Sequence, residues 1–284
     1  MLTNSSQVLR AAKERHFAIP SANFVDEMSL QSHLAVAQRR GLPIILAHAQ
    51  GHQGRYLTVE EAGEMATYYA KKASVPVVLH LDHGQSAEMA DRAIRAGFTS
   101  VMIDASMMPL ERNIAITKEV IALAHRCGVS AEAEIGHVGS GAKYTEDSDT
   151  IYTSVSEAVE FAEKTGVDSL AVSIGTAHGL YKGTPQISFE RLHEIAAAVD
   201  VPLVLHGGSS SGDENLARCA AEGITKINIY SDFMVAGASA AMKVDAAGDE
   251  GAAVQDYYRY TDAMRKAMQK CLDHYYTVFG TQKI

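Results

Sequence analysis

The chain has 284 residues, of which 47% are hydrophobic and 21% charged, and its 34 acidic against 25 basic residues give a formal net charge of −9. This composition excludes an intrinsically disordered chain, and the acidic balance disfavours a nucleic-acid partner. The three cysteines are far apart, the amino terminus lacks the apolar core of a signal peptide, and no apolar run reaches the roughly 18 residues of a membrane helix. We therefore expect a soluble cytoplasmic protein without disulfides or membrane spans.

Short apolar runs rich in β-branched residues alternate along the chain with longer segments of helical period. The predicted strands are Phe17–Asn23, Pro43–His48, Val75–His83, Ser100–Ala105, Val129–Gly136, Ser169–Gly175, Pro202–Gly208 and Lys226–Asp232. The predicted helices between them are Ser29–Arg40, Thr58–Lys72, Ser86–Ala96, Pro109–Cys127, Ser154–Thr165, Ser188–Val199 and Gly212–Glu222. Several of these helices begin at a capping box and end at a glycine.

Repeated strand–helix units predict parallel strands, and eight of them favour a closed (β/α)₈ barrel of the α/β class. The rival fold is an open doubly wound sheet, but the exit of the first strand, Pro20–Ser29, lacks the glycine-rich motif of that fold. We expect one domain over residues 1–284. A helix within Met1–His16 would plug the barrel bottom, and further helices would follow Asp232.

Polar side chains gather where the predicted strands end. They are Asp82 and His83, Asp104, Glu132 and Glu134, His178, His206, Asn228 and Ser231. In a parallel barrel these ends meet at one rim, where barrel enzymes keep their active sites. Each residue alone could serve structure, for example by capping a helix. Three histidines with neighbouring carboxylates have no common structural cause, so the pattern predicts a metal site.

The chemistry of this site follows from its donor types. Three histidine ligands with an open fourth position are typical of catalytic zinc, although cobalt, iron and manganese accept similar ligands. The glutamates would offer a second metal position or orient the ligands. Glycines at Gly179 and Gly207–Gly208, with Lys182 nearby, favour a phosphate site, unless they only form tight turns. No lysine lies centrally in a predicted strand, which disfavours a Schiff-base mechanism.

Six long stretches carry a family resemblance. They are LHLDHG (79–84), SVMIDAS (100–106), EAEIG (132–136), SLAVSIGTAHGLYKG (169–183), PLVLHGGSS (202–210) and KINIYSD (226–232). In order and spacing the chain resembles the class II fructose-1,6-bisphosphate and tagatose-1,6-bisphosphate aldolases over nearly its whole length. The implied activity is reversible cleavage of such a ketose bisphosphate to dihydroxyacetone phosphate and an aldehyde.

The resemblance also implies residue roles. It assigns Zn²⁺ to His83, His178 and His206, and proton transfer at the C4 oxygen to Asp82. Asp104 and Glu134 would lie near a second metal position. The implied substrate-binding residues are Asn23, Gly179, Lys182, Gly207, Gly208, Ser209, Asn228, Ile229, Tyr230, Ser231 and Arg265. A monovalent cation such as Na⁺ or K⁺, and a homodimer or homotetramer, are further implications.

Three departures from the family pattern lie in the aldehyde half of the site. Ala22–Asp26 differs from the usual Phe-Asn-Val-x-Asn, and Ala49 replaces a hydroxyl residue. The acidic residues of the loop after strand five come late, at Glu146 and Asp147. Three alternatives therefore stay open: an aldolase for a ketose 1-phosphate without the distal phosphate, a metal-dependent epimerase or isomerase, and a noncatalytic barrel that partners an aldolase.

Overall fold

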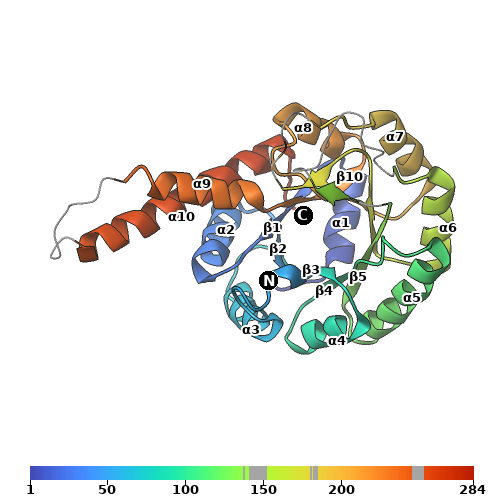
Figure 1. The fold of residues 1–284 in the computed structure, drawn as a ribbon, viewed down its shortest axis with the longest axis horizontal. Helices are drawn as coiled ribbons and strands as arrows, with labels where there is room; N and C mark the ends of the chain where they lie inside the picture. The colour runs from blue at the N-terminus through green and yellow to red at the C-terminus, as the bar shows by residue number, and fades with distance from the viewer. Residues whose placement is uncertain (137, 141–151, 180, 182–184, 245–252) are drawn as a thin grey trace.

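The computed structural model describes residues 1–136, 138–140, 152–179, 181, 185–244 and 253–284. Parallel strands close into a barrel in the order β1-β10-β9-β7-β5-β4-β3-β2, which confirms the predicted fold (Figure 1). The barrel strands are β1 (Ile19–Asn23), β2 (Ile44–Ala49), β3 (Val77–Gly84), β4 (Ser100–Ile103), β5 (Ser130–Ile135), β7 (Ser169–Val172), β9 (Leu203–Leu205) and β10 (Ile224–Ile229). Each lies within or close to a predicted strand.

The helices between the strands form the outer ring (Figure 1). They are α2 (Glu27–Arg40), α3 (Val59–Ala70), α4 (Ala87–Arg95), α5 (Leu110–Arg126), α6 (Val155–Thr165), α7 (Phe189–Ala198) and α8 (Asp213–Ala221), with the short helix η1 (Gln50–His52) after β2. The capping box predicted at Thr58 and Glu61 is present. Helix α2 starts earlier than predicted, because Asp26 accepts a hydrogen bond from the Ser29 amide and caps it.

Successive side chains of the strands alternate between the hydrophobic core under the helices and the interior of the barrel. In β3, Leu79 and Leu81 belong to the main hydrophobic core with α3 residues such as Ala66. The intervening His80 and Asp82 are buried and form hydrogen bonds with residues of other barrel strands. The barrel interior is therefore polar along part of its axis, and this polar column leads to the carboxyl ends of the strands.

Helix α1 (Ser5–Glu14) lies at the opposite end of the barrel. Its apolar face packs in a separate cluster against residues near the strand starts; the members are Val8, Leu9, Ala12, Phe17, Ile19, Ile45 and Val78. The Ser5 amide donates to Ser130 Oγ at 3.0 Å, at the first residue of β5. These contacts confirm the predicted plug at the barrel bottom.

Helices α9 (Ser231–Ala241) and α10 (Ala253–Val278) form an arm that projects from the barrel (Figure 1). The last turns of α10 return to the barrel, where the Phe279 carbonyl accepts a hydrogen bond from the Ala18 amide at 3.2 Å. Thr281 Oγ1 donates to the Ala18 carbonyl at 2.6 Å. The carboxyl-terminal segment thus packs beside the start of β1. Among the helices described, none combines the length and apolar character needed to cross a bilayer.

Candidate active site

A cleft of about 340 Å³ opens at the carboxyl ends of the strands. Of the residues predicted to form the site, Asn23, Asp82, His83, His178, Gly179, Gly207, Ser209, Asn228, Tyr230 and Ser231 line it. Ala49 and His52, from the end of β2 and from η1, complete the lining. The structure therefore brings most of the predicted site together at one rim of the barrel.

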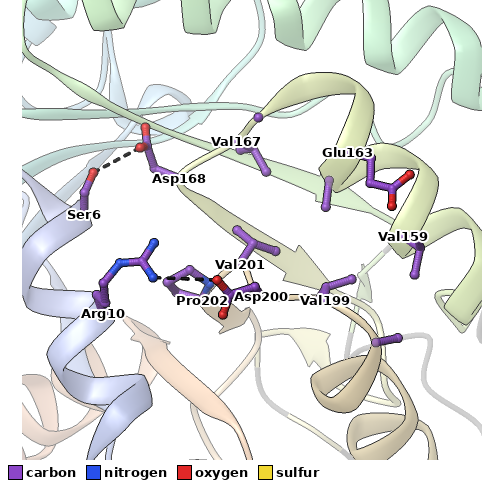
Figure 2. Close-up of a pocket in the computed structure, with 13 residues that line it drawn as sticks. Ser6, Arg10, Val159, Glu163, Val167, Asp168, Val199, Asp200, Val201 and Pro202 are labelled. Atoms are coloured by element: carbon purple, nitrogen blue, oxygen red, sulfur yellow. Dashed lines mark hydrogen bonds and ion pairs between the residues drawn. The ribbon is translucent and has the colours of Figure 1, made fainter.

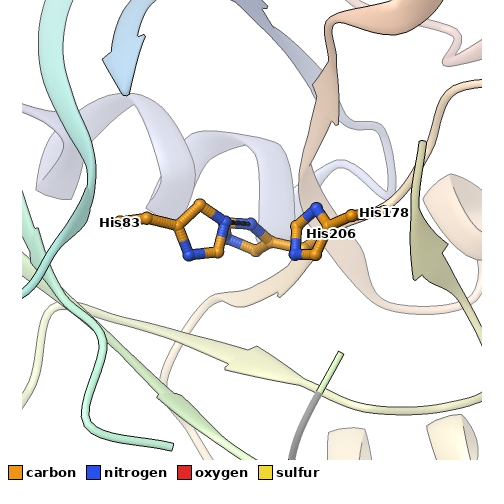
Figure 3. A group of neighbouring side chains, drawn as sticks. All are labelled: His83, His178 and His206. Atoms are coloured by element: carbon orange, nitrogen blue, oxygen red, sulfur yellow. Dashed lines mark hydrogen bonds between the residues drawn. The ribbon is translucent and has the colours of Figure 1, made fainter. Parts of the chain in front are cut away.

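The three predicted metal ligands lie together at this cleft: His83 and His178 line it, and His206 is buried beside them (Figure 3). His83 ends β3, His178 lies in the two-residue strand β8 (Ala177–His178), and His206 follows β9. Each offers a ring nitrogen within 4.8 Å of the other two, and His83 Nε2 lies 3.0 Å from His206 Nδ1. Nitrogens this close can share one cation.

Local backbone features place two of these imidazoles. His83 has φ of 50°, and the β3–β4 register shifts between Leu81 and Gly84. A non-glycine residue in this region costs on the order of 1–3 kcal/mol, a strain that functional sites retain. His178 was predicted to follow a barrel strand, and in the structure it lies in β8, which pairs with β6 (Gly139–Ser140) and so fixes its backbone.

Carboxylates hold the outer nitrogens of two histidines. His83 Nδ1 lies 2.9 Å from Asp104 Oδ2, and His206 Nε2 lies 3.1 Å from Glu132 Oε1. An ionised carboxylate only accepts hydrogen bonds, so each imidazole donates to it through its outer nitrogen. Without a metal, the two nitrogens that face each other share one proton, and a bound cation would replace that proton. Burial and the neighbouring imidazoles lower the pKa of His178 to about 3, so His178 is neutral. This donor set fits zinc.

Asp82 lies beside the histidines and is buried. Its two oxygens accept hydrogen bonds from Asn23 Nδ2 at 2.8 Å and from Asn228 Nδ2 at 2.9 Å. Burial alone would raise the pKa of Asp82, but the charges of His83 and His206 hold it well below its ordinary value. In return, the Asp82 charge and Asp104 overcome the effect of burial and raise the pKa of His83 to about 9. Asp82 is thus an ionised base held in a fixed orientation.

A second group of potential ligands shares His83. It consists of His83, Asp104 and Glu134, whose donor atoms also lie within 4.8 Å of one another. Burial and the Asp104 charge raise the pKa of Glu134 to about 8. Glu134 Oε1 accepts from the Val138 amide at 3.3 Å, while its buried Oε2 finds no hydrogen-bond partner among the described residues. This geometry fits the predicted second metal position.

Another part of the cleft is built from backbone. Gly207 has φ of 70°, and a Cβ there would collide with the Ala177 carbonyl oxygen, so only glycine fits. Ser209 Oγ accepts from the Tyr230 amide at 3.1 Å and holds the start of α9 beside the cleft. Helix α9 begins at Ser231 without a side-chain cap. Its amino-terminal N–H groups and positive dipole end suit an anion.

Comparison with known proteins supplies the family. The family model described as fructose-bisphosphate aldolase class-II matches residues 3–283. The chain belongs to this family. It is therefore a class II aldolase, a carbon–carbon lyase of sugar metabolism, in a family that depends on zinc and acts on phosphorylated sugars.

Individual relatives cover almost the whole aldolase. The chain is 36% identical to the fructose-bisphosphate aldolase of Staphylococcus epidermidis and to the probable fructose-bisphosphate aldolase of Bacillus subtilis, over 99% of this chain and 98% of each relative. The crystal structure of the YdjI aldolase from Escherichia coli superimposes with a TM-score of 0.87 at 33% identity, covering 99% of this chain and 98% of that one.

Other predicted site residues lie elsewhere or outside the described residues. The Gly208 amide donates to the Asn228 carbonyl at 3.2 Å, and the Ile229 side chain is buried in the core, so neither lines the cleft. Arg265 is exposed on α10, and its substrate role stays a prediction. Lys182, Glu146 and Asp147 lie outside the described residues.

Two features of the aldolase were missed from the sequence. His52 lines the cleft, and its only signal was a histidine shortly after the second strand. The expectation that no lysine lies centrally in a strand is wrong. Lys226 lies inside β10, which begins at Ile224, and is only 1% exposed. Its Nζ contacts both oxygens of Glu132 and does not line the cleft, so the position gives no support to a Schiff base.

A larger cleft of about 490 Å³ lies at the barrel bottom (Figure 2). Its polar groups contact one another: Ser6 Oγ donates to Asp168 Oδ1 at 3.1 Å, and Arg10 lies 3.8 Å from Asp200. It lies among the amino-terminal ends of the strands, away from the histidines. Barrel enzymes place their chemistry at the other end.

Proposed function

We propose that the aldolase reversibly cleaves the C3–C4 bond of a ketose 1,6-bisphosphate of the fructose or tagatose type, which gives dihydroxyacetone phosphate and an aldehyde. One observation carries the proposal: three histidine nitrogens lie within 4.8 Å of one another, and two of these histidines line the same cleft as the ionised Asp82, in a chain of this family. Retro-aldol chemistry needs both functions, a cation against developing negative charge and a group that moves a proton.

His83, His178 and His206 are the proposed Zn²⁺ ligands, and Asp104 with Glu134 the proposed second position. When bound, zinc supplies a Lewis acid that stabilises negative charge on the substrate oxygens. Asp104 holds the outer nitrogen of His83 at 2.9 Å and so fixes which nitrogen faces the cleft. The unpartnered Glu134 Oε2 is the atom that supports a second position.

Asp82 is the proposed acid–base residue at the C4 oxygen. In cleavage it takes the proton from the C4 hydroxyl, and in condensation it returns that proton to the new oxygen. Asn23 and Asn228 bind both carboxylate oxygens and so direct Asp82 into the cleft. Its lowered pKa keeps it ready to accept a proton in the cleavage direction.

The proposed seat of the dihydroxyacetone phosphate end is the part of the cleft lined by backbone. It combines the glycine backbone at Gly179 and Gly207, the start of α9 at Tyr230 and Ser231, and the Asn228 side chain. Gly208, Ile229, Lys182 and Arg265 stay predictions. A monovalent cation near Gly207 would compete for its carbonyl, which already accepts from Tyr181 and from Ser211 Oγ.

A ketose 1-phosphate without the distal phosphate is the second candidate substrate. The observation that favours it is the lining at the end of β2 and in η1, where the cleft presents Ala49 and His52. The His52 pKa is lowered, chiefly by burial, so this wall presents a neutral imidazole. Such a wall suits the hydroxyls of a sugar chain.

An assay on a panel of ketose mono- and bisphosphates tests the proposal. Triose phosphate release should require zinc, stop after exhaustive chelation and return when zinc is added back. Release that survives complete metal removal would overturn the zinc mechanism. Epimerised sugar without triose phosphate would identify an epimerase, and inactivity on the whole panel would favour a partner barrel.

We also propose that the aldolase self-associates as a homodimer or homotetramer. The arm carries large exposed apolar side chains, namely Val235, Met242, Val254, Tyr257 and Tyr258. Grouped apolar side chains on a projecting element support an interface between copies. Analytical ultracentrifugation should show a dimer or tetramer, and a monomer at micromolar concentration would contradict this.

A further inference from the structure

A buried ion pair lies inside the barrel beneath the histidines. Lys226 of β10 and Glu132 of β5 are each 1% exposed. Lys226 Nζ lies 2.7 Å from Glu132 Oε1 and 2.9 Å from Oε2, so the ammonium group contacts both carboxylate oxygens. Oε1 in turn lies 3.1 Å from His206 Nε2, and Ser169 Oγ donates to Oε2 at 3.2 Å. Each oxygen of the Glu132 carboxylate therefore has two hydrogen-bond donors.

Stability is a poor explanation for this pair. Burying two charges carries a desolvation cost that their attraction often fails to exceed, and apolar residues of similar volume would stabilise a barrel interior at least as well. Glu132 also belongs to neither of the two potential metal-binding groups found among the described residues. The remaining feature of Glu132 is its hydrogen bond with His206, which suggests a role in holding that ring.

We propose that Lys226 and Glu132 form an internal clamp that fixes the ring orientation and tautomer of His206, and thereby sets how tightly the aldolase holds its metal. This inference rests on the proposed function, since it takes His206 as a zinc ligand. The clamp residues are positioning residues and do not contact the substrate cleft.

The geometry gives the clamp a specific task. His206 Nε2 donates to Glu132, so the lone pair is left on Nδ1, the atom 3.0 Å from His83 Nε2. Asn228 Nδ2 is a donor 3.3 Å from the same Nδ1, a contact that suits the same tautomer. A carboxylate that Lys226 holds through both oxygens fixes this tautomer, because it accepts a hydrogen bond and cannot donate one.

The clamp is also tied into the barrel. Lys226 Nζ lies 3.3 Å from His80 Nε2, and His80 Nδ1 lies 2.9 Å from Ser100 Oγ. The neighbouring strands therefore hold the ammonium group in place. The support of His83 differs: its partner Asp104 accepts from the Ser106 hydroxyl at 2.7 Å, but Asp104 is partly exposed and belongs to the second ligand group.

The test compares Lys226→Met and Glu132→Gln with Ser21→Ala. Ser21 is an equally buried barrel residue whose hydroxyl has no partner among the described residues, which makes it a matched control. Zinc dissociation constants would be measured by chelator competition, and the visible spectrum of the Co²⁺-loaded protein would report ligand geometry. Metal-free unfolding curves would show that each variant folds.

We expect both clamp variants to weaken zinc binding by roughly 10–100-fold and to change the cobalt spectrum, while Ser21→Ala leaves both unchanged. Folded clamp variants with unaltered affinity and spectrum would overturn the inference. If Lys226→Met does not fold, the nearly isosteric Glu132→Gln decides. His178→Ala separates the two proposals: unchanged zinc binding in that variant would refute the zinc site itself, whereas loss there with intact clamp variants would refute only the clamp.

Discussion

Asp82 and His83 are neighbours in sequence, yet both line the same cleft. Successive side chains of a regular strand point to opposite faces, so an undistorted β3 could not present both. The positive φ of His83 and the register shift before Gly84 break that alternation. At the residue scale, this backbone distortion is what joins the proposed base to the proposed metal site.

Asp82→Asn should separate proton transfer from metal binding. The amide keeps the size of the side chain but is a poor base, so kcat should fall by roughly 10²–10⁴-fold. Zinc content should not change, because Asp82 does not belong to either ligand group. Steady-state triose phosphate release and metal analysis would check this.

Asp168→Asn is the matched control for that variant. Asp168 is a hydrogen-bonded aspartate at the barrel bottom, where it accepts from the Ala131 amide at 2.7 Å. Its replacement should leave kcat near that of the wild type. A fall of less than ten-fold in Asp82→Asn would exclude Asp82 as the acid–base residue.

At the scale of elements, the loop after β9 has a glycine that no other residue can replace. Gly207→Ala should displace β8, because its Cβ would collide with the Ala177 carbonyl next to His178. We expect lost zinc affinity and a raised KM for the ketose phosphate. Gly128→Ala is the control, since Gly128 has the same φ of 70° but no described atom within 4 Å of its Cβ position. Gly128→Ala should lower the free energy of unfolding by only roughly 1–2 kcal/mol, which is the cost of a left-handed backbone for a residue with a Cβ.

Unfolding curves, zinc titrations and steady-state kinetics on the two glycine variants would distinguish these costs. Equal effects in both variants would show that backbone conformation alone matters. In that case the contact between the β9 loop and β8 would not position His178.

The short helix η1 carries a second prediction. His52 lies with its ring centroid 4.7 Å from that of Tyr230, and its buried Nδ1 has no partner among the described residues. A substrate hydroxyl would satisfy that atom. His52→Phe keeps the ring contact with Tyr230 and removes the nitrogen. The KM for the aldehyde should therefore rise about five-fold, which corresponds to the loss of one hydrogen bond of about 1 kcal/mol.

Initial rates in the condensation direction would measure this effect. The KM for dihydroxyacetone phosphate should change less, because His52→Phe keeps the ring beside Tyr230, which belongs to the proposed seat. A parallel rise in both KM values would instead indicate a general disturbance of the cleft.

Local patterns predicted the elements well. Strand runs, the Thr58 capping box and the helix-ending glycines depend on neighbouring residues, and the structure contains them. The convergence of His83, His178 and His206 followed from one rule, that parallel strand ends share a rim. The roles assigned to those residues stay proposals.

What the sequence could not predict depends on distant partners. The pairing of β8 with β6, which fixes His178, joins segments with no local signal. Lys226 was missed because its predicted strand began too late, and only the folded barrel brings Glu132 to it. His52 lies in a short helix whose position depends on the cleft.

At the scale of the whole molecule, buried neutral histidines should make the metal-free aldolase sensitive to acid. Burial lowers the pKa of His33 to about 4 and that of His80, helped by Lys226, to about 3. The unfolded chain binds these protons near pH 6.5, so unfolding is favoured as pH falls below that value. The stabilisation from these neutral histidines is complete above about pH 6.5 and is lost as the pH falls toward 4. His33 alone accounts for on the order of 3 kcal/mol of the free energy of unfolding.

Urea unfolding at pH 7 and at pH 4.5 would measure this loss. His33→Gln keeps a donor for the Asn23 carbonyl, which His33 Nε2 contacts at 3.2 Å, and removes the titration. The variant should therefore lose less stability between the two pH values than the wild type does. Identical losses would show that His33 does not contribute to the acid response.

The seam between β1 and β10 has a consequence for synthesis of the protein. Ile19 pairs with Lys226, so the first strand leaves the ribosome long before its neighbour exists. Until then the nascent sheet keeps two open edges, each able to pair with another chain. The start of β1 also receives Phe279 and Thr281, which exchange hydrogen bonds with Ala18 only after the chain end has been made. A stop codon that removes only this last turn would leave every proposed ligand in place, yet would remove both hydrogen bonds from Ala18 and loosen the strand at which the barrel closes.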